Sequence, residues 1–327
     1  MTCVWAGAFG EGRKIRRGKP KIVVVGSSNM DLVVKSARIP SVGETILGGD
    51  FIMNPGGKGA NQAVAAAKLG AEVYFVAKLG DDIFGAQSLE NFKQEKVATK
   101  YVKQTQETPS GVALIMVDGS GNNIIVVAPG ANQKLCPEDV KEAESDIASA
   151  GCVVAQLEVP LETVEFAARL ANTSGVPFIL DPAPAQKLDC ELLAATDVLK
   201  PNETEAEILT GIRVTGRDSA RAAAENLLEQ GVKAVVLTMG AKGFLLADSD
   251  RTEFVPAIKV NAVDATAAGD AFTGALAFGL ARGRTLSQAG CFANYVAALS
   301  VTKMGAQSSM PNAQEVESFI KAGHLME

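Results

Sequence analysis

An acidic residue closes a run of small residues at positions 264–270, which read DATAAGD, and an apolar stretch at 271–281 follows directly. In a run without bulky side chains, the backbone N–H groups of Ala268, Gly269 and Asp270 can converge on an anion where a helix begins, and the helix dipole adds to the attraction. This arrangement predicts a phosphoryl site, with Asp270 as the base for a hydroxyl aimed at that group. The simpler alternative makes Asp270 an ordinary first-turn acid and Asp264 a turn residue.

A second loop, NPGGKGAN at 54–61, has three glycines in four positions and opens an Ala-rich stretch at 60–69. Glycine lets a ligand touch the backbone, and the Lys58 ammonium and the Asn61 amide offer partners for sugar hydroxyls. Asn29 and Asp31 follow an apolar run at 22–25. They therefore lie at the carboxyl end of a sheet, where open α/β folds bind ligands. The alternative for the loop is a flexible turn before a helix.

Composition excludes several other classes of site. The chain of 327 residues has one histidine, His324, which excludes Ser-His-Asp hydrolysis and HExxH zinc sites, and its net charge of −6 argues against a nucleic-acid partner. Gly57-Lys58 is followed by Gly59 instead of Ser or Thr, and no GxGxxG opens a helix after the first apolar run, so a P-loop or dinucleotide site is disfavoured. Five scattered cysteines and the lack of a long apolar run predict a cytoplasmic protein with no membrane span.

The elements that must position these residues alternate from residue 21 onward. Short β-branched runs, the expected strands, lie at 22–25, 73–76, 152–156, 178–180, 197–200, 234–238 and 243–247, with a further strand-like run at 258–263. Ala-rich amphipathic stretches, the expected helices, lie at 60–69, 161–171, 219–230 and 271–281. This alternation is typical of a doubly wound, mostly parallel sheet in an α/β domain.

Two regions break the alternation. Runs at 32–34, 45–53, 101–104, 112–117 and 123–127 have no helix between them, and the DGSG turn at 118–121 is a hairpin signal. We expect a small β-sheet lid, formed by about 32–53 and 100–128, on a domain spanning 21–327. The lid is expected to pair with a second copy as a homodimer, and the basic segment 1–20 is expected to be a disordered tail.

Five motifs in order resemble the ribokinase-like (PfkB) carbohydrate kinases over roughly residues 21–320. They are GSSNMD at 26–31, GGKGAN at 56–61, QLE at 156–158, NETEAE at 202–207 and DATAAGD at 264–270. The resemblance implies a three-layer α/β/α sandwich with a β lid that clasps a second subunit. It also implies transfer of a phosphoryl group from MgATP to the 5-hydroxyl of D-ribose. Rival functions are a fructokinase-like or adenosine-like kinase on the same scaffold, or a non-catalytic sugar or nucleotide sensor.

The resemblance also implies roles for individual residues. Sugar-binding residues would be Asn29, Asp31, Gly57, Lys58, Asn61 and Glu158, with Asp270 as the base. Nucleotide-binding residues would be Asn202, Thr238, Gly240, Ala268, Gly269 and Asn294, with Glu205 holding Mg²⁺ through water. Carboxylates at Asp31 and Glu158 suit a neutral sugar better than a sugar phosphate. Asn202 has a second, compatible reading as the cap of a helix that contains Glu205.

A monovalent cation site, for K⁺, is implied by two further loops. Its residues would be Asp264, Thr266, Ser300, Lys303, Gly305 and Ser309, several of them through backbone carbonyls. One position departs from the pattern, because many relatives have glycine where this chain has Ala267. The donors of the predicted phosphoryl site are backbone N–H groups, so we expect alanine to fit at this position provided that its φ is negative.

Overall fold

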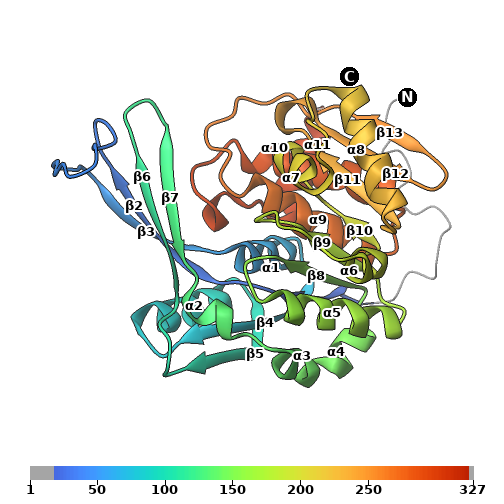
Figure 1. Ribbon diagram of the computed structural model, residues 1–327, viewed down its shortest axis with the longest axis horizontal. Coiled ribbons are helices and arrows are strands. Elements are labelled where there is room, and N and C mark those ends of the chain that lie inside the picture. Colours follow the sequence, from blue (N-terminus) through green and yellow to red (C-terminus); the bar gives the residue numbers. More distant parts are fainter. Residues whose placement is uncertain (1–17, 324–327) are drawn as a thin grey trace.

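A nine-stranded sheet forms the centre of the molecule in the computed structural model, which describes residues 18–323 (Figure 1). Residues 1–17 of the expected tail at 1–20, and His324, lie outside the described residues. The strand order is β13-β12-β11-β10-β9-β8-β1-β4-β5. The strands are β1 (Lys21–Val25), β4 (Glu72–Gly80), β5 (Val97–Thr105), β8 (Cys152–Gln156), β9 (Phe178–Asp181), β10 (Val198–Leu199), β11 (Ala234–Thr238), β12 (Phe244–Asp248) and β13 (Thr252–Val255). Neighbours from β11 to β5 are parallel, whereas β12 and β13 pair antiparallel, which confirms the mostly parallel sheet.

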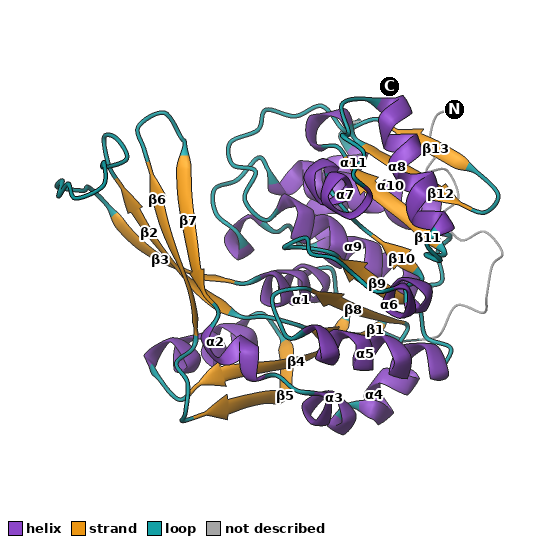
Figure 2. Ribbon diagram, in the orientation of Figure 1, coloured by secondary structure: helices purple, strands orange, loops and turns teal. Residues whose placement is uncertain are grey.

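Each face of this sheet is covered by helices (Figure 2). Successive side chains of a strand point to opposite faces, so Ile22 and Val24 pack into one core and Val23 and Val25 into the other. The first core is completed by α1 (Lys58–Lys68), α2 (Ile83–Gln94), α9 (Ala268–Ala281), α10 (Leu286–Ser300) and α11 (Ala313–Lys321). The second is completed by α3 (Pro137–Glu142), α4 (Glu144–Ser149), α5 (Leu161–Thr173), α6 (Cys190–Ala195), α7 (Glu203–Thr210) and α8 (Arg217–Glu229). The molecule therefore has the expected three-layer α/β/α sandwich.

Helix α9 lies in the middle of its layer, between α1 and α10. All ten residues from Asp270 to Gly279 are buried, so the helix is enclosed on every side. Small residues permit this, because a Cβ on Gly274 would lie 2.7 Å from Cβ of Ala65 in α1. The close approach of α9 to α1 brings Asp270 to the side chains that follow the glycine-rich loop.

A separate four-stranded sheet projects from one side of the sandwich (Figure 1). Its order is β3-β2-β6-β7, with β2 (Asn29–Lys35), β3 (Phe51–Gly56), β6 (Gly111–Val117) and β7 (Asn123–Ala128). The predicted hairpin turn joins β6 to β7, where the Asp118 side chain accepts hydrogen bonds from the backbone N–H groups of Ser120 and Asn122, each at 2.9 Å. The prediction of a small separate sheet is confirmed.

Two strand predictions were wrong, and the run 45–53 is a strand only from Phe51 onward. The run 101–104 belongs to β5 of the large sheet, where it pairs with β4, because Val97 and Tyr101 are buried against the body of the protein. The run 258–263 forms no strand; instead the N–H groups of Val263 and Asp264 donate to the carbonyl of Val301, which ties the segment to the end of α10. Within residues 18–323, no helix combines the length and the apolar character needed to cross a membrane.

Candidate active site

The polar side chains predicted to bind ligand converge at the carboxyl ends of the parallel strands, around the boundary between β1 and β8. From β1 the chain proceeds to β4 and β5 on one side, and from β8 it proceeds to β9, β10 and β11 on the other. The strand order therefore reverses between β1 and β8, and open α/β sheets bind ligands at such a reversal. Asn29 and Asp31 follow β1, and Glu158 follows β8, so the two sides of the boundary each contribute.

The glycine-rich loop closes against these residues. Gly57 has φ 89° and a Cβ at this position would lie 2.6 Å from the Asn29 nitrogen, so both the conformation and the space require glycine. The Glu158 carboxylate accepts hydrogen bonds from the Lys58 N–H at 3.1 Å and from the Ser27 hydroxyl at 2.5 Å. The structure thus brings Asn29, Gly57, Lys58 and Glu158 together, as the motifs predict.

Charges at this end of the site are strongly coupled. Burial, together with the negative charges of Glu158 and Asp270, raises the pKa of Asp31 to about 7. Burial opposes the charge of Lys58, yet the surrounding carboxylates, led by Asp270, outweigh it and raise the pKa of the ammonium. The Lys58 ammonium therefore lies among several carboxylates.

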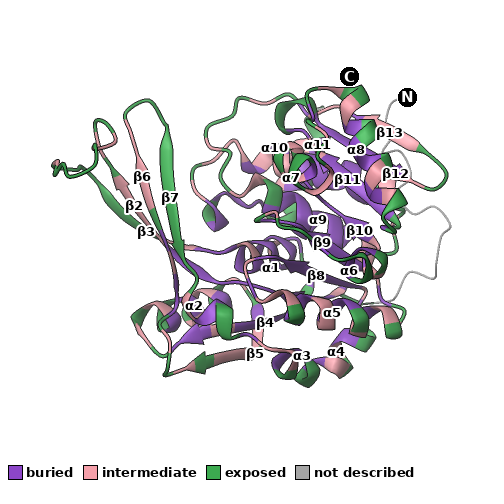
Figure 3. Cartoon of the chain, in the orientation of Figure 1, coloured by how far each residue is buried: buried purple, intermediate pink, exposed green. Residues whose placement is uncertain are grey.

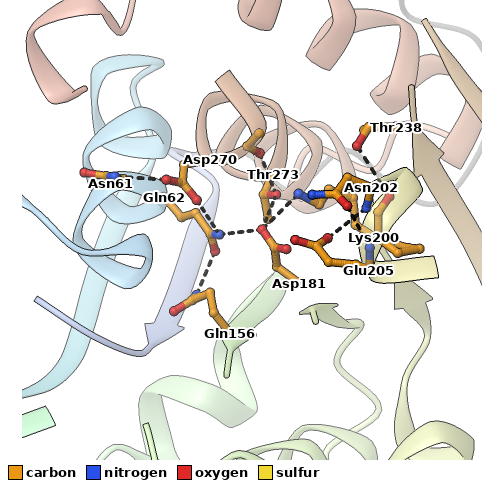
Figure 4. Close-up of polar contacts among 12 residues, drawn as sticks. Asn61, Gln62, Gln156, Asp181, Lys200, Asn202, Glu205, Thr238, Asp270 and Thr273 are labelled. Atoms are coloured by element: carbon orange, nitrogen blue, oxygen red, sulfur yellow. Dashed lines mark hydrogen bonds and ion pairs between the residues drawn. The ribbon is translucent and has the colours of Figure 1, made fainter. Parts of the chain in front are cut away.

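Asp270 lies in the first turn of α9, is buried, and is held by two amides (Figure 4). The Asn61 side chain donates to one carboxylate oxygen at 2.9 Å, and Gln62 donates to the other at 3.0 Å. Burial raises the pKa of Asp270, against the opposing effects of Lys58 and of these two hydrogen bonds. A carboxylate that is oriented on both oxygens and has an increased proton affinity is suited to act as a general base.

Three further members of this polar network were missed from the sequence: Gln62, Asp181 and Lys200. Gln62 also donates to Asp181 at 2.9 Å, and Asp181 forms an ion pair with Lys200 at 2.9 Å. Gln62 adjoins Asn61 in the glycine-rich motif, and this adjacency was the available signal. Asp181 ends β9 and Lys200 directly follows the neighbouring strand β10, and only the order of strands in the sheet reveals that they are close.

The start of α9 differs in two respects from the turn that was predicted to bind an anion. Ala267 has φ 58°, in the left-handed region, so the expectation of a negative φ was wrong; the turn into the helix requires the conformation that glycine adopts at no steric cost. The prediction that the Ala268 N–H faces the anion was also wrong, because this group donates to the Ala265 carbonyl at 3.2 Å. The N–H groups of Gly269 and Asp270 have no backbone acceptor within the described residues, and they remain for an anion.

A second cluster lies at the ends of β10 and β11. Asn202 caps α7: its side chain accepts from the Glu205 N–H at 2.8 Å, and the Glu205 carboxylate accepts from the Asn202 N–H at 2.8 Å. Asn202 also forms an isolated parallel β-bridge with Thr238, and Gly240, two residues further along the chain, has φ 52°. The capping role of Asn202 is confirmed. Burial and the negative charge of Asp181 raise the pKa of Glu205, against the opposing charge of Lys200.

The remaining predicted residues lie at the rim of the site. Asn294 is buried on α10 and donates to the Pro256 carbonyl at 2.8 Å, so it anchors the segment that leads into the anion-binding turn. Asp264 joins two loops, since it accepts from the Thr266 hydroxyl at 2.6 Å and from the Gly305 N–H at 2.8 Å. Ser300 and Ser309 donate to carbonyls in their own turns, and Lys303 pairs with Glu315. Because the Lys303 side chain is already paired, this residue would bind a cation through its backbone carbonyl.

Residues 18–323 contain no cluster of three or more side chains of the types that bind metal ions through His, Cys, Asp or Glu. Mg²⁺ keeps several waters and is usually bound through one or two carboxylates together with substrate phosphates. The single carboxylate of Glu205 therefore fits Mg²⁺ bound in this way.

Comparison with known proteins agrees with this geometry. The model of the pfkB family carbohydrate kinases matches residues 19–313. The chain is 42% identical to a ribokinase of Haemophilus influenzae, over 92% of this chain and 98% of the relative, and 42% identical to a deoxyribokinase of Salmonella typhi, over 91% and 98%. The structure of Arabidopsis thaliana ribokinase complexed with ribose and ATP has a TM-score of 0.88 and 35% identity, over 93% of this chain and 99% of that one. This chain therefore belongs to the pfkB family of carbohydrate kinases.

Proposed function

We propose that this protein is a ribokinase, which transfers the γ-phosphoryl group of MgATP to the 5-hydroxyl of D-ribose. The observation that carries the proposal is Asp270: a buried carboxylate, held by Asn61 and Gln62, at the start of the helix whose Gly269 and Asp270 N–H groups are open to an anion. Asp270 thus contributes to both sites: its carboxylate is the base, and its backbone N–H group is part of the phosphate site. The ribokinase relatives support the sugar, and the family supports the reaction class.

In the proposed reaction the ribose O5 atom attacks the γ-phosphorus in line. A bond forms between O5 and phosphorus, the bond between phosphorus and the bridging oxygen breaks with its electron pair leaving on ADP, and the O5 proton passes to Asp270. Positioning and charge neutralisation supply most of the acceleration, and the base contributes roughly 10² to 10⁴. Burial favours this step because it raises the proton affinity of Asp270.

The sugar would bind beside the glycine-rich loop, with Asn29, Asp31, Gly57, Lys58 and Glu158 as its partners. Sugar hydroxyls donate to the carboxylates and accept from Lys58 and from backbone N–H groups. The Asn29 amide oxygen is already oriented, since it accepts from the Asn132 side chain at 2.7 Å. Asn61 would orient both the base and a nearby hydroxyl.

The nucleotide would occupy the other half, with Asn202, Thr238, Gly240, Ala268, Gly269 and Asn294 around it. Glu205 would hold Mg²⁺ through a water molecule, and a divalent cation there would favour the ionised carboxylate.

K⁺ activation is proposed at the two loops joined by Asp264, with Thr266, Ser300, Lys303, Gly305 and Ser309 contributing largely through carbonyls. Both loops border the start of α9, so an ion there would stiffen the anion-binding turn.

The small sheet supports a homodimer through the lid. In the strand register, Asp31 alternates with Leu32, and Leu32 is paired with Met53 and Leu114, which in turn pairs with Val126. The face opposite Asp31, here called the outer lid face, consists of the exposed side chains Phe51, Met53, Leu114, Ile124 and Val126. Apolar patches of this kind mark interaction surfaces. Five scattered cysteines, an odd number with no CxxC spacing, support a cytoplasmic location.

A coupled ADP-release assay with ribose, 2-deoxyribose, fructose and adenosine tests the proposal. We expect ribose to give the highest kcat/KM and ATP turnover without sugar to be small, because water must be excluded from the closed site. A preference for 2-deoxyribose would fit the deoxyribokinase relative, which is as similar as the ribokinase. Lack of turnover with every acceptor would instead support a sensor that kept the fold.

A further inference from the structure

The Lys200 side chain is a cation held inside the site. Lys200 directly follows β10, and its backbone N–H donates to the Leu180 carbonyl at 2.9 Å. The residue is 4% exposed, and its ammonium nitrogen lies 2.9 Å from Oδ2 of Asp181, which is 1% exposed (Figure 4). Replacing a buried ion pair by apolar residues is often neutral or stabilising, so stability alone gives little reason for this pair.

Asp181 acts as an anchor for that cation. Its Oδ2 atom accepts from Lys200, from Gln62 at 2.9 Å and from the Thr273 hydroxyl at 3.2 Å, whereas Oδ1 is buried without a protein partner. Gln62 in turn donates to Asp270. A continuous set of contacts therefore fixes the position of Lys200 relative to the proposed base.

The ammonium faces the anion-binding turn. A Cβ placed on Gly269 would lie 3.5 Å from the Lys200 nitrogen, so the cation is in reach of the turn whose Gly269 and Asp270 N–H groups are open. An ammonium has three N–H donors, and among residues 18–323 Asp181 is its one side-chain partner. The remaining donors of Lys200 and the two backbone N–H groups can therefore act on the same anion.

We propose that Lys200 is a catalytic residue that binds the terminal phosphoryl group at the start of α9. The inference rests on the proposed function and extends it. As the bond from O5 to phosphorus forms and the bond to the bridging oxygen breaks, charge is distributed over the non-bridging oxygens. The ammonium of Lys200 stabilises that charge, while Asp270 receives the proton from O5. Asp181 is a positioning residue that holds Lys200 in place.

The test uses the double variant K200M/D181N of the full chain, in which both partners of the ion pair become neutral and neither is left as an isolated buried charge. Two ligands are compared by calorimetry: ADP, which lacks the terminal phosphoryl group, and a non-hydrolysable ATP analogue, which has it, each with Mg²⁺. We expect ADP affinity to stay within about threefold and analogue affinity to fall at least tenfold, since charged hydrogen bonds contribute roughly 1.5–3 kcal/mol. With ribose, kcat should fall by about 10² to 10³.

Two single variants separate the roles. D181N keeps the Lys200 cation but removes its anchor, so its analogue affinity should lie between that of the unmodified protein and that of the double variant, whereas K200Q should repeat the selective loss of the double variant. K233M is a matched control, since Lys233 forms an exposed ion pair with Asp197 at 2.7 Å, and it should change neither affinity.

An equal loss of ADP and analogue affinity in K200M/D181N and K200Q, or unchanged affinities with unchanged kcat, would overturn the assignment. The nucleotide comparison needs no sugar. A wrong choice of acceptor would therefore appear as absent ribose turnover in the unmodified protein, separately from the result for Lys200.

Discussion

The proposed catalytic end of the site is buried and internally paired, whereas the small sheet exposes apolar side chains. Figure 3 shows the contrast in burial between α9, which is mostly buried, and β7, which is exposed. Asp270 is 6% exposed and both of its carboxylate oxygens accept hydrogen bonds, while Leu114 is 54% and Val126 60% exposed. The body of the protein therefore orients the proposed base without ligands, whereas the lid is proposed to be covered by substrate or by a second copy. Substitutions in the two regions should fail in different ways.

The largest effect is expected at the buried end. D270N keeps the shape of the side chain and removes the base, so kcat should fall by at least about 10²-fold while nucleotide affinity is retained. Steady-state kinetics and ADP calorimetry measure both quantities. D218N is the matched control, because Asp218 is also a first-turn acid, on α8, and is exposed. Near-normal turnover in D270N would contradict the assignment of the base.

A charge on the outer lid face tests the other region. V126E would bury a carboxylate without a partner in the proposed dimer, and at about 3 kcal/mol the dimer Kd would rise on the order of 100-fold. Sedimentation measures the change, and ADP affinity should be preserved because the nucleotide half lies on the body. I208E is the control, since Ile208 is similarly exposed but lies on α7. An unmodified protein that sediments as a monomer would remove the dimer proposal.

Acidity should act on the sugar end, where lid and body meet. Asp31 has its pKa raised to about 7, so it is increasingly protonated as the pH falls below 7 and then accepts fewer hydrogen bonds from sugar hydroxyls. The kcat/KM for ribose should decline by up to about tenfold per pH unit below 7. In D31N the value should be lower throughout but should lose the inflection near pH 7. The same inflection in D31N would assign it to another group.

The smallest effect is expected at the anion-binding turn. Ala267 adopts a left-handed conformation, which costs about 1–2 kcal/mol for a residue with a Cβ. A267G removes this cost, but glycine loses more conformational entropy on folding than alanine does, which costs roughly 0.5–1 kcal/mol. The net gain in the free energy of unfolding should be at most about 1.5 kcal/mol, with ATP turnover within about twofold. Thermal unfolding measures the gain, and K96G, at a non-glycine residue with φ 61°, provides a control outside the site. A clear loss of stability would show that the alanine is not strained.

Prediction from sequence was most successful where a property is local. The alternation of apolar runs and helices, the hairpin at Asp118, the cap at Asn202 and the placement of Asp270 at the start of a helix all depend on neighbouring residues, and all are present. The lid assignment of Tyr101 was wrong because a short apolar strand fits either sheet, and burial against the body decided its place.

The other differences depend on the arrangement of strands and turns in space. The strand predicted at 258–263 is replaced by hydrogen bonds to Val301, which directly follows α10. Asp181 and Lys200 are brought to Asp270 by the order of β9, β10 and β8 in the sheet, and no spacing along the chain encodes it. The backbone angle of Ala267 likewise follows from how the loop enters α9.

The most direct test of the account is a crystal structure of the protein with ribose and a non-hydrolysable ATP analogue. We predict the sugar O5 atom within roughly 2.6–3.2 Å of the Asp270 carboxylate, and the terminal phosphate on the Gly269 and Asp270 N–H groups. A sugar that presents another hydroxyl to Asp270, or a phosphate bound away from the start of α9, would contradict it.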